Sequence, residues 1–433
     1  MEYSIRRLER VEVGKMQSTY LLGLFIAVFC ATGLGHPDSE KAPTDDLIQE
    51  EQRDVINRAF SVMSTSNAEF AFHLYKKLAS ENPMGNVLFS PLSLSIAFAL
   101  LSLGAGGTTK TQILEGLRFN LTEIPEAEIH RGFQELIQSF NISNNGFKLN
   151  TGNALFIGKN LELLEKFQGD SKSLYSTEAF STDFLNPELA KKQINDYVKN
   201  QTQGKIPQLF DSLEENTVMV LVNYIFFKAK WETPFHPSDT HTKEFYVSEE
   251  KVIEVPMMYK NKLFTRVFQD KELFCTVVEL KYIGNATALF ILPDEKKMKD
   301  VEDALSSEVL NKWKNSLKQS EIKLFLPRFS ISRNYELQKI LPTMGIEDVF
   351  TNRANLSGIT EQNIKVSKVV HKAVMDVDEA GTEASAATGI EIALVSSMYD
   401  STPVIKFNRP FLLLLSNERD IFFMGKVRNP QNE

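Results

Sequence analysis

The chain has 433 residues, of which 42% are hydrophobic, and carries a formal net charge of −8. This composition supports a large buried core, and the negative charge excludes a general attraction to nucleic acid or anionic lipid. Length alone predicts two or three domains, because cores usually divide beyond about 250–300 residues. No Pro/Gly/Ser-rich linker divides the chain after residue 60, so we expect one large domain over residues 61–433.

The amino terminus has the order of features of a secretory signal peptide. An apolar run from Tyr20 to Cys30 is followed by small residues and preceded by four basic ones: Arg6, Arg7, Arg10 and Lys15. A retained signal anchor is the alternative, but the run is short for a span of about 20 residues. We expect a signal peptide over residues 1–35, with Met16 as an alternative start. Its removal takes away four basic and three acidic residues, which changes the net charge to −9.

The next segment, residues 36–60, is polar and acidic, and we expect a flexible arm there. Phe70, Leu74 and Leu78 recur at a spacing of four residues. This spacing places them on one face of a helix and predicts an amphipathic helix at the start of the domain.

A second, more apolar helix is expected from Leu92 to Leu103. It follows Ser90-Pro91, and proline is favoured in the first turn of a helix. The glycine cluster at residues 104–107 should end this helix, and another helix is expected from Thr109 to Leu117. The cluster lacks the GK[ST] ending of a nucleotide-binding loop.

The longest strand-like run is Val218–Lys228, which is almost continuously apolar. Such a run predicts a strand in the middle of a sheet. Further strands are expected at Ala288–Leu292, Glu321–Leu326 and Phe411–Leu415. Strands and helices that do not alternate regularly indicate the α+β class.

Cysteines and glycosylation motifs fit a secreted chain. Cys30 lies in the signal, so the mature chain keeps only Cys275, which we expect to be an inert thiol in a core strand. Five Asn-X-Ser/Thr motifs are candidate glycosylation sites, at Asn120, Asn141, Asn200, Asn285 and Asn355.

The sequence carries no sign of catalysis or of metal binding. There is no G-x-S-x-G motif, and no serine stands in a nucleophile context near His371. His236 and His241 are five residues apart and lack a helical zinc motif. We therefore expect no enzyme activity, no metal and no cofactor.

The most unusual segment is residues 378–408. Its part from Gly381 to Gly389 consists almost entirely of small residues, and its part from Ile390 to Val395 is apolar. In a strand, alternate residues from Thr382 to Leu394 would share one face, which could be buried. An Ala/Ser-rich surface linker is the alternative interpretation.

Five motifs in order along the chain resemble the serpin family over about Ser61–Pro430. They are NVLFSPLSLS at residues 86–95, NYIFFKAKWETPF at 223–235, VHKAVMDV at 370–377, DEAGTEASAAT at 378–388 followed by FNRPF at 407–411, and FFMGKVRNP at 422–430. Within the family, the chain is similar to the group of antitrypsin, antichymotrypsin and kallistatin.

The resemblance implies the serpin fold, with a large mixed central sheet, further sheets, about eight to nine helices and a mobile reactive loop near the C-terminus. A protease that cuts this loop would be trapped covalently when the loop enters the central sheet. The hinge of the loop would comprise Glu379, Gly381, Thr382, Ala384, Ser385, Ala386, Ala387 and Thr388. Ser90, Ser93, Asn223 and His371 would form the hydrogen-bonded shutter beneath the sheet, and Trp231 would lie at the top, where the loop enters.

The reactive bond is placed by counting about fifteen residues from the hinge glycine, as in inhibitory members of the family. The count from Gly381 reaches Val395, which gives the bond Val395–Ser396, and a shift by one residue gives Leu394–Val395. A small apolar residue before the cut favours an elastase-like target, and leucine there would favour a chymotrypsin-like one.

The resemblance also leaves a non-inhibitory hormone carrier as the alternative function, although the small hinge residues favour an inhibitor. The expected partner is a serine protease, in a covalent complex with an otherwise monomeric, secreted, extracellular protein. No contact with nucleic acid, or with membrane after signal cleavage, is expected. Heparin binding is left open. Four basic residues are candidates for it, but Glu321 lies among them, so we expect them to form a solvated face: Lys312, Lys314, Lys318 and Lys323.

Overall fold

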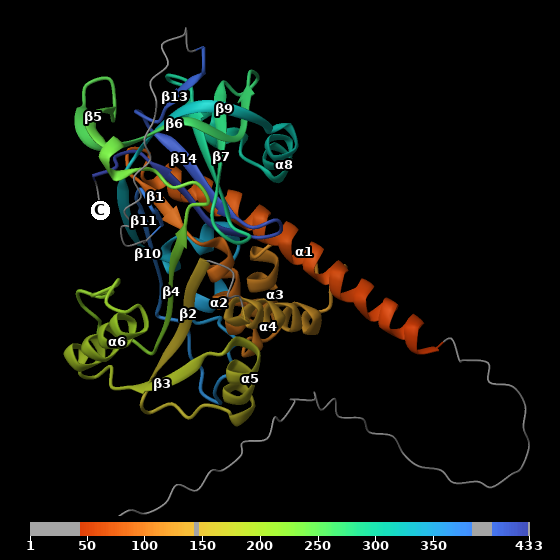
Figure 1. The fold of residues 1–433 in the computed structure, drawn as a ribbon. Helices are drawn as coiled ribbons and strands as arrows, with labels where there is room; N and C mark the ends of the chain where they lie inside the picture. Colours follow the sequence, from red (N-terminus) through yellow and green to blue (C-terminus); the bar gives the residue numbers. More distant parts are fainter. Residues whose placement is uncertain (1–43, 143–146, 383–400, 432–433) are drawn as a thin grey trace, which may run out of the picture. The chain divides into compact units, whose positions relative to one another are not determined.

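The computed structural model describes residues 44–142, 147–382 and 401–431 (Figure 1). The chain forms two units, Met1–Glu50 and Glu51–Glu433, and the architecture that follows is that of the second. Helix α1 (Thr44–Glu81) begins inside the segment 36–60 that the sequence predicts as an arm. Residues 36–43 lie outside the described part of the chain.

A six-stranded sheet forms the centre of the fold, with the order β10–β11–β12–β4–β2–β3. The apolar run predicted as a central strand is β4, which is buried from Met219 to Phe227 and has neighbours on both sides. The sheet is mixed, because the pairs β11–β4 and β2–β3 are parallel. Its strands are β2 (Phe147–Gly158), β3 (Glu178–Thr182), β4 (Met219–Lys230), β10 (Phe329–Glu336), β11 (Lys368–Val377) and β12 (Gly381–Thr382).

A second sheet has nine strands, in the order β1–β15–β14–β8–β7–β6–β9–β13, with β5 paired to β6. The three other predicted strands lie in it as β8, β9 and β14. Its strands are β1 (Val87–Phe89), β5 (His241–Tyr246), β6 (Val252–Asp270), β7 (Cys275–Lys281), β8 (Thr287–Pro293), β9 (Lys318–Pro327), β13 (Val404–Lys406), β14 (Phe411–Ser416) and β15 (Ile421–Val427).

Eight α-helices lie within the described residues, so the predicted α+β class is confirmed. The cap of α2 follows from its sequence, since Ser90 Oγ accepts the backbone N–H of Ser93 over 3.1 Å and Pro91 occupies the first turn. In the described ranges, no helix combines the length and the apolar character that crossing a membrane requires. Besides α1 the helices are α2 (Pro91–Leu103), α3 (Gly107–Gly116), α4 (Glu126–Ile142), α5 (Glu165–Tyr175), α6 (Pro187–Gln201), α7 (Met298–Ala304) and α8 (Ser307–Ser316).

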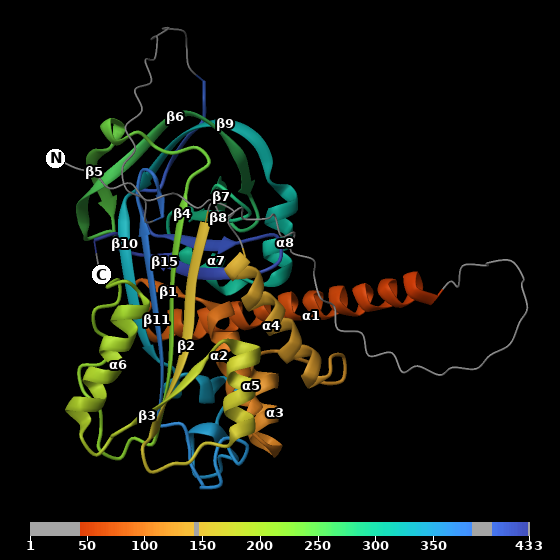
Figure 2. The same ribbon diagram turned by 60° about the horizontal axis from the view of Figure 1, so that its bottom comes forward.

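The two faces of β4 are buried in different cores. Leu221, Ile225 and Phe227 belong to the main core, which also contains α2 and much of the nine-stranded sheet. The alternate residues, from Val220 to Phe226, belong to a smaller core that α6 covers (Figure 2). A strand added beside β4 would therefore be covered on both faces, which explains why β4 is apolar at nearly every position.

We predict that a methyl group at Gly425 would destabilise the fold. A Cβ there would lie 2.6 Å from Val87 O, so β1 and β15 would have to separate. Gly425→Ala should lower the free energy of unfolding by about 1–3 kcal/mol, as measured by urea denaturation. The matched control is Gly169→Ala in α5, where no atom lies within 4 Å and alanine should stabilise the helix by about 1 kcal/mol. Equal effects at the two positions would contradict the prediction.

Candidate functional site

The candidate site begins at the turn that joins β11 to β12. Asp378 organises this turn, because its Oδ1 accepts the backbone N–H groups of Ala380 (2.8 Å) and Gly381 (3.0 Å). The backbone N–H of Asp378 donates to Gly381 O over 2.9 Å. Aspartate is favoured in turns because its short side chain can accept such bonds from the residues that follow. The turn reverses the chain, so that β12 runs back along β11.

Strand β12 holds two of the predicted hinge residues between β11 and β4. Thr382 is paired with Val377 on one side and with Ala229 on the other, and Gly381 is paired with Lys230. A Cβ at Gly381 would lie 2.0 Å from Ala229 O, so the close approach of the two backbones requires glycine. The beginning of an inserted strand is therefore already present in the sheet.

The side chain of Thr382 is anchored by an aromatic stack. Its hydroxyl lies 2.7 Å from the hydroxyl of Tyr282, and neither side chain is open to solvent. Tyr282 stacks on Trp231, with ring centroids 4.1 Å apart and planes inclined by 20°. The indole N–H of Trp231 donates to Asp378 O and its backbone N–H donates to Ala380 O, both over 2.9 Å. Burial raises the pKa of Tyr282, which keeps its hydroxyl neutral.

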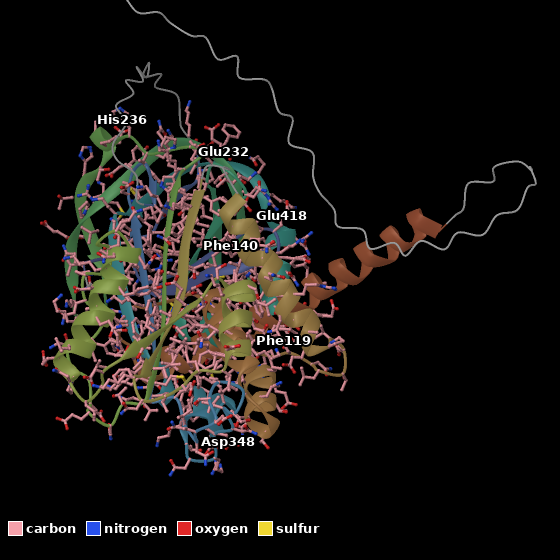
Figure 3. All side chains as sticks on the ribbon, turned by 90° about the horizontal axis from the view of Figure 1, so that it is seen from below. Phe119, Phe140, Glu232, His236, Asp348 and Glu418 are labelled. Atoms are coloured by element: carbon pink, nitrogen blue, oxygen red, sulfur yellow. The ribbon has the colours of Figure 1, made fainter. Side chains whose placement is uncertain are left out.

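Glu379 fixes the other side of the turn. Its Oε1 accepts the hydroxyl of Thr240 over 2.6 Å and lies 3.8 Å from the guanidinium of Arg328. Glu232 and His236, labelled in Figure 3, belong to the segment that leads from Trp231 towards Thr240. The hinge turn is therefore held by the segment that follows β4 as well as by β11.

The structure brings the four predicted shutter residues together. The Nε2 atom of His371 accepts the backbone N–H of Ser90 over 3.0 Å, and its Nδ1 lies 2.5 Å from Asn223 Oδ1. The amide of Asn223 also donates to Ser93 Oγ over 2.6 Å. Burial lowers the pKa of His371 to about 3, so the ring is neutral at physiological pH. A neutral ring that accepts at Nε2 carries its proton at Nδ1, where it donates to Asn223.

Two further members of this cluster were missed by motif reasoning. Asn223 donates to Asn153 Oδ1 over 2.7 Å, and Ser93 Oγ lies 2.8 Å from Thr151 Oγ1. Asn153 is directly opposite Asn223 in the pairing of β2 with β4. Their signal in the sequence is a polar pair at a spacing of two in the segment LNTGNALF. Tyr282 was also missed, because nothing local to it indicates a contact with the hinge.

Below β12, the sheet is closed by direct pairing of β11 with β4. Residues 368–374 run parallel to residues 220–226, without a strand between them. His371 and Asn223 are opposite each other in this pairing, so their buried hydrogen bond joins the two strands side chain to side chain. Further insertion of the loop must break this ladder.

The remaining predicted residues fall into two groups. The part of the hinge from Ala384 to Thr388 and the reactive-bond residues Leu394, Val395 and Ser396 lie outside the described residues. The glycosylation candidates with described side chains are all exposed, as glycosylation requires: Asn120, Asn200, Asn285 and Asn355. The side chain of Asn141 is not among those described.

The structure corrects the expectation that the four lysines of α8 and β9 form one solvated face. Lys312 forms ion pairs with Asp270 (2.9 Å) and Glu272 (2.7 Å), and burial lowers the pKa of Lys314. Of the four lysines considered, only Lys318 is exposed. The sequence could not reveal this, because the carboxylates come from the last residue of β6 and the turn after it, about forty residues earlier in the chain.

Cys275 begins β7 and is buried. Burial raises the pKa of its thiol to about 12, so the thiol stays protonated at neutral pH and is unreactive. This confirms its placement in a core strand.

Comparison with known proteins gives the same architecture. A family model described as "Serpin (serine protease inhibitor)" matches residues 65–430. The chain belongs to the serpin family. Among its curated relatives, alpha-1-antichymotrypsin from Homo sapiens is 52% identical over 422 residues, which cover 96% of this chain and 99% of the relative. Serpin A3-6 from Bos taurus is 51% identical over 413 residues, covering 94% and 97% of the two chains.

Solved structures agree with the sequence relatives. Human thyroxine-binding globulin complexed with thyroxine superposes with a TM-score of 0.82 at 45% identity, covering 86% of this chain and all of that one. Human glycosylated kallistatin superposes with a TM-score of 0.81 at 43% identity, covering 87% of this chain and all of that one. The serpin fold predicted from the motifs is confirmed, together with the antichymotrypsin-like group.

We predict that His371 makes the intact protein sensitive to acid. Because its pKa in the folded state lies below the ordinary value of 6.5, its contribution to stability is present above pH 6.5 and is lost as the pH falls towards 3. Lowering the pH from 7 to 5 should remove about 2 kcal/mol from the free energy of unfolding through this residue. Urea denaturation at both pH values measures the effect, and His371→Gln should lack this part of the pH dependence. An unchanged pH dependence in the variant would refute the assignment.

Proposed function

We propose that the protein is a secreted inhibitor that a serine protease attacks as a suicide substrate at Val395–Ser396. After the cut, the loop would enter the six-stranded sheet between β11 and β4 and carry the attached protease with it. The observation that carries the proposal is β12, because Thr382 is already paired with both of these strands and Gly381 with β4. Insertion would continue an existing strand, which is easier than beginning a new one.

The register of β12 determines where each loop residue would lie. Since Thr382 pairs with Ala229 in an antiparallel ladder, Ala384 would pair with Phe227 and Ile392 with Met219, the first residue of β4. The sheet therefore has room for the loop up to about Ile392. This supports a cut only a few residues further along, near Val395.

The side chains of the loop suit the two cores that would receive them. Residues paired with Phe227, Ile225 and Leu221 would face the main core, and these are Ala384, Ala386 and Ile390. Small residues that enter first can pass the crowded top of the sheet, and the isoleucine that follows adds about 1.5–3 kcal/mol of burial. Insertion of about ten residues at about 1 kcal/mol per ladder bond contributes on the order of 10 kcal/mol.

The same register places Thr388 at the level of the shutter, between Asn223 and His371. These two residues are directly bonded in the intact protein and would be separated by the new strand. The threonine hydroxyl can donate to one and accept from the other, so no buried polar group would lose its partner. The shutter would thus change partners when the strands part.

The residue before the cut sets the class of protease. Valine suits a shallow apolar pocket, as in elastase-like enzymes, and a register shifted to Leu394–Val395 would suit a chymotrypsin-like enzyme.

We propose that the signal peptide (residues 1–35) directs the chain to the extracellular space. We also propose that the arm (residues 36–60) precedes a single domain over residues 61–433, that the exposed asparagine motifs are glycosylated, and that the protein acts as a monomer.

The first test is a screen for covalent complexes. The protein is mixed with elastase-, chymotrypsin- and trypsin-like proteases, and denaturing gels are run. We expect a stable high-mass band with an elastase- or chymotrypsin-like enzyme, and a released C-terminal peptide that begins at Ser396 by mass spectrometry. Cleavage of the loop by every active enzyme without such a band would exclude inhibition.

The second test blocks insertion at the hinge. Thr382 is fully buried against Tyr282, so Thr382→Arg would require an unpaired charge in the sheet, at a cost of several kcal/mol. The variant should still be cut at Val395–Ser396 but should lose the covalent complex.

The matched control is Glu383→Arg, because in an extended strand this residue would face the side opposite to Thr382, level with the exposed side chain of Lys228. This variant should remain an inhibitor. Equal inhibition by both arginine variants would show that the loop does not insert.

Cutting the loop should also raise the melting temperature of the wild-type protein by tens of degrees, on the scale of about 2 °C per kcal/mol.

A hormone carrier is the second candidate function, favoured by the superposition on thyroxine-binding globulin. It predicts a saturable small-molecule site and no covalent complex. Calorimetric titration with thyroxine and with steroid hormones decides the matter, since tight binding of one of them without complex formation would replace the inhibitor proposal.

A further inference from the structure

Two lysines from the opposite edge strands of one sheet segment converge on a single aromatic ring. Strands β5, β6, β9 and β13 lie together at one end of the unit (Figures 1 and 2). The Nζ atoms of Lys243 on β5 and Lys406 on β13 are each 5.6 Å from the ring centroid of Phe325 on β9. Tyr259 on β6 packs against the same ring, with centroids 4.6 Å apart. We call these four residues the cation–aromatic patch.

The patch is accessible and positively charged. Both lysines are exposed, and within the described residues neither has an ion-pair partner, whereas the two rings are half-buried. Glu244, beside Lys243 on β5, accepts a hydrogen bond from the hydroxyl of Tyr246 over 2.7 Å. Glu321 is the acidic residue of β9 and lies four positions before Phe325. On a chain with a net charge of −8, this local excess of cations needs an explanation.

Edge protection does not explain the arrangement. A lysine on an edge strand discourages pairing with another chain when it points into solvent. Lys243 and Lys406 instead approach one ring in the middle of the segment, which fixes two ammonium groups on one surface. Fixed cations beside aromatic rings suit recognition of an acidic protein surface, because their side chains have less freedom left to lose on binding.

The position of β13 determines what must cover the patch. The strand begins at Val404, eight residues after Ser396, so the reactive bond lies within about 29 Å of chain from it. A protease domain of about 200 residues is roughly 40 Å across. An enzyme bound at Val395–Ser396 is therefore wide enough to reach the patch. Lys406 lies on β13, the strand that follows the loop, and Phe325 lies directly opposite it in the pairing of β13 with β9.

We propose that the cation–aromatic patch is a docking surface for the target protease, and that this protease carries acidic residues beside its active-site cleft. The inference rests on the proposed function and narrows its partner. Complementary charge acts mainly on the rate of association and hardly at all on the chemistry that follows. The patch would then select among proteases that accept the same loop sequence.

The test is the double charge reversal Lys243→Glu/Lys406→Glu, assayed against the protease that gives the covalent band. The second-order rate constant of inhibition should fall at least tenfold at low ionic strength, and the difference should shrink as salt is added. The number of inhibitor molecules consumed per enzyme and the first residue of the released peptide should stay the same. The control is Lys271→Glu/Lys365→Glu, which makes the same change in net charge at two exposed lysines outside the four strands.

The outcomes separate this proposal from the one on which it rests. A covalent complex that forms equally fast with the patch and control variants overturns the docking surface and leaves the inhibitor function standing. Loss of heparin-column retention in the patch variant, with an unchanged rate of inhibition, also overturns it and assigns the patch to a polysaccharide. A rate that falls only in the patch variant supports it, and the melting temperature of that variant shows whether the fold is intact.

Discussion

The direct pairing of β11 with β4 is the constraint on which the rest of the structure depends. These strands form a parallel ladder in the middle of the six-stranded sheet, although a strand would fit between them and β12 already begins one. The sheet is closed over seven residues of each strand and parted only at its upper end. The sheet has room for another strand and the chain can supply one, so the intact protein is held away from its most fully paired state. The energy available for function is this unmade set of hydrogen bonds and buried side chains.

The polar cluster beneath the sheet holds that state without making it permanent. His371 and Asn223 bond across the ladder, and Ser90, Ser93 and Asn153 satisfy the rest of their hydrogen-bonding groups. A purely apolar contact at this level would close the sheet equally well, but it would offer nothing to an entering threonine. Hydrogen-bonding groups can exchange one partner for another of the same type, so the barrier to parting the strands is lower than the loss of every bond would suggest.

The hinge and strand β13, which follows the loop, lie at the same end of the unit and would act at different steps of inhibition. The aromatic stack of Trp231 and Tyr282 holds Thr382 in register with β4. Strand β13 anchors the other end of the loop, on a segment that carries cations and aromatic rings. The aromatic stack would act after the cut, when the loop enters the sheet. The segment around β13 would act before the cut, when a protease binds.

The sequence by itself determined the fold class, the central strand β4, the capped helix α2 and the family, because each rests on local signals: apolar runs, a Ser-Pro start and motifs in a fixed order. The run of small residues at 381–389 is visible without a structure, but only the resemblance to serpins made it a predicted hinge. Only the tertiary structure decided which polar groups meet. Thr151, Asn153 and Tyr282 joined the site, and Lys312 left the solvated face, through partners between 42 and 100 residues away in the chain. Strand register and helix docking set these contacts, and a residue's local sequence carries no record of the distant side chain that will face it.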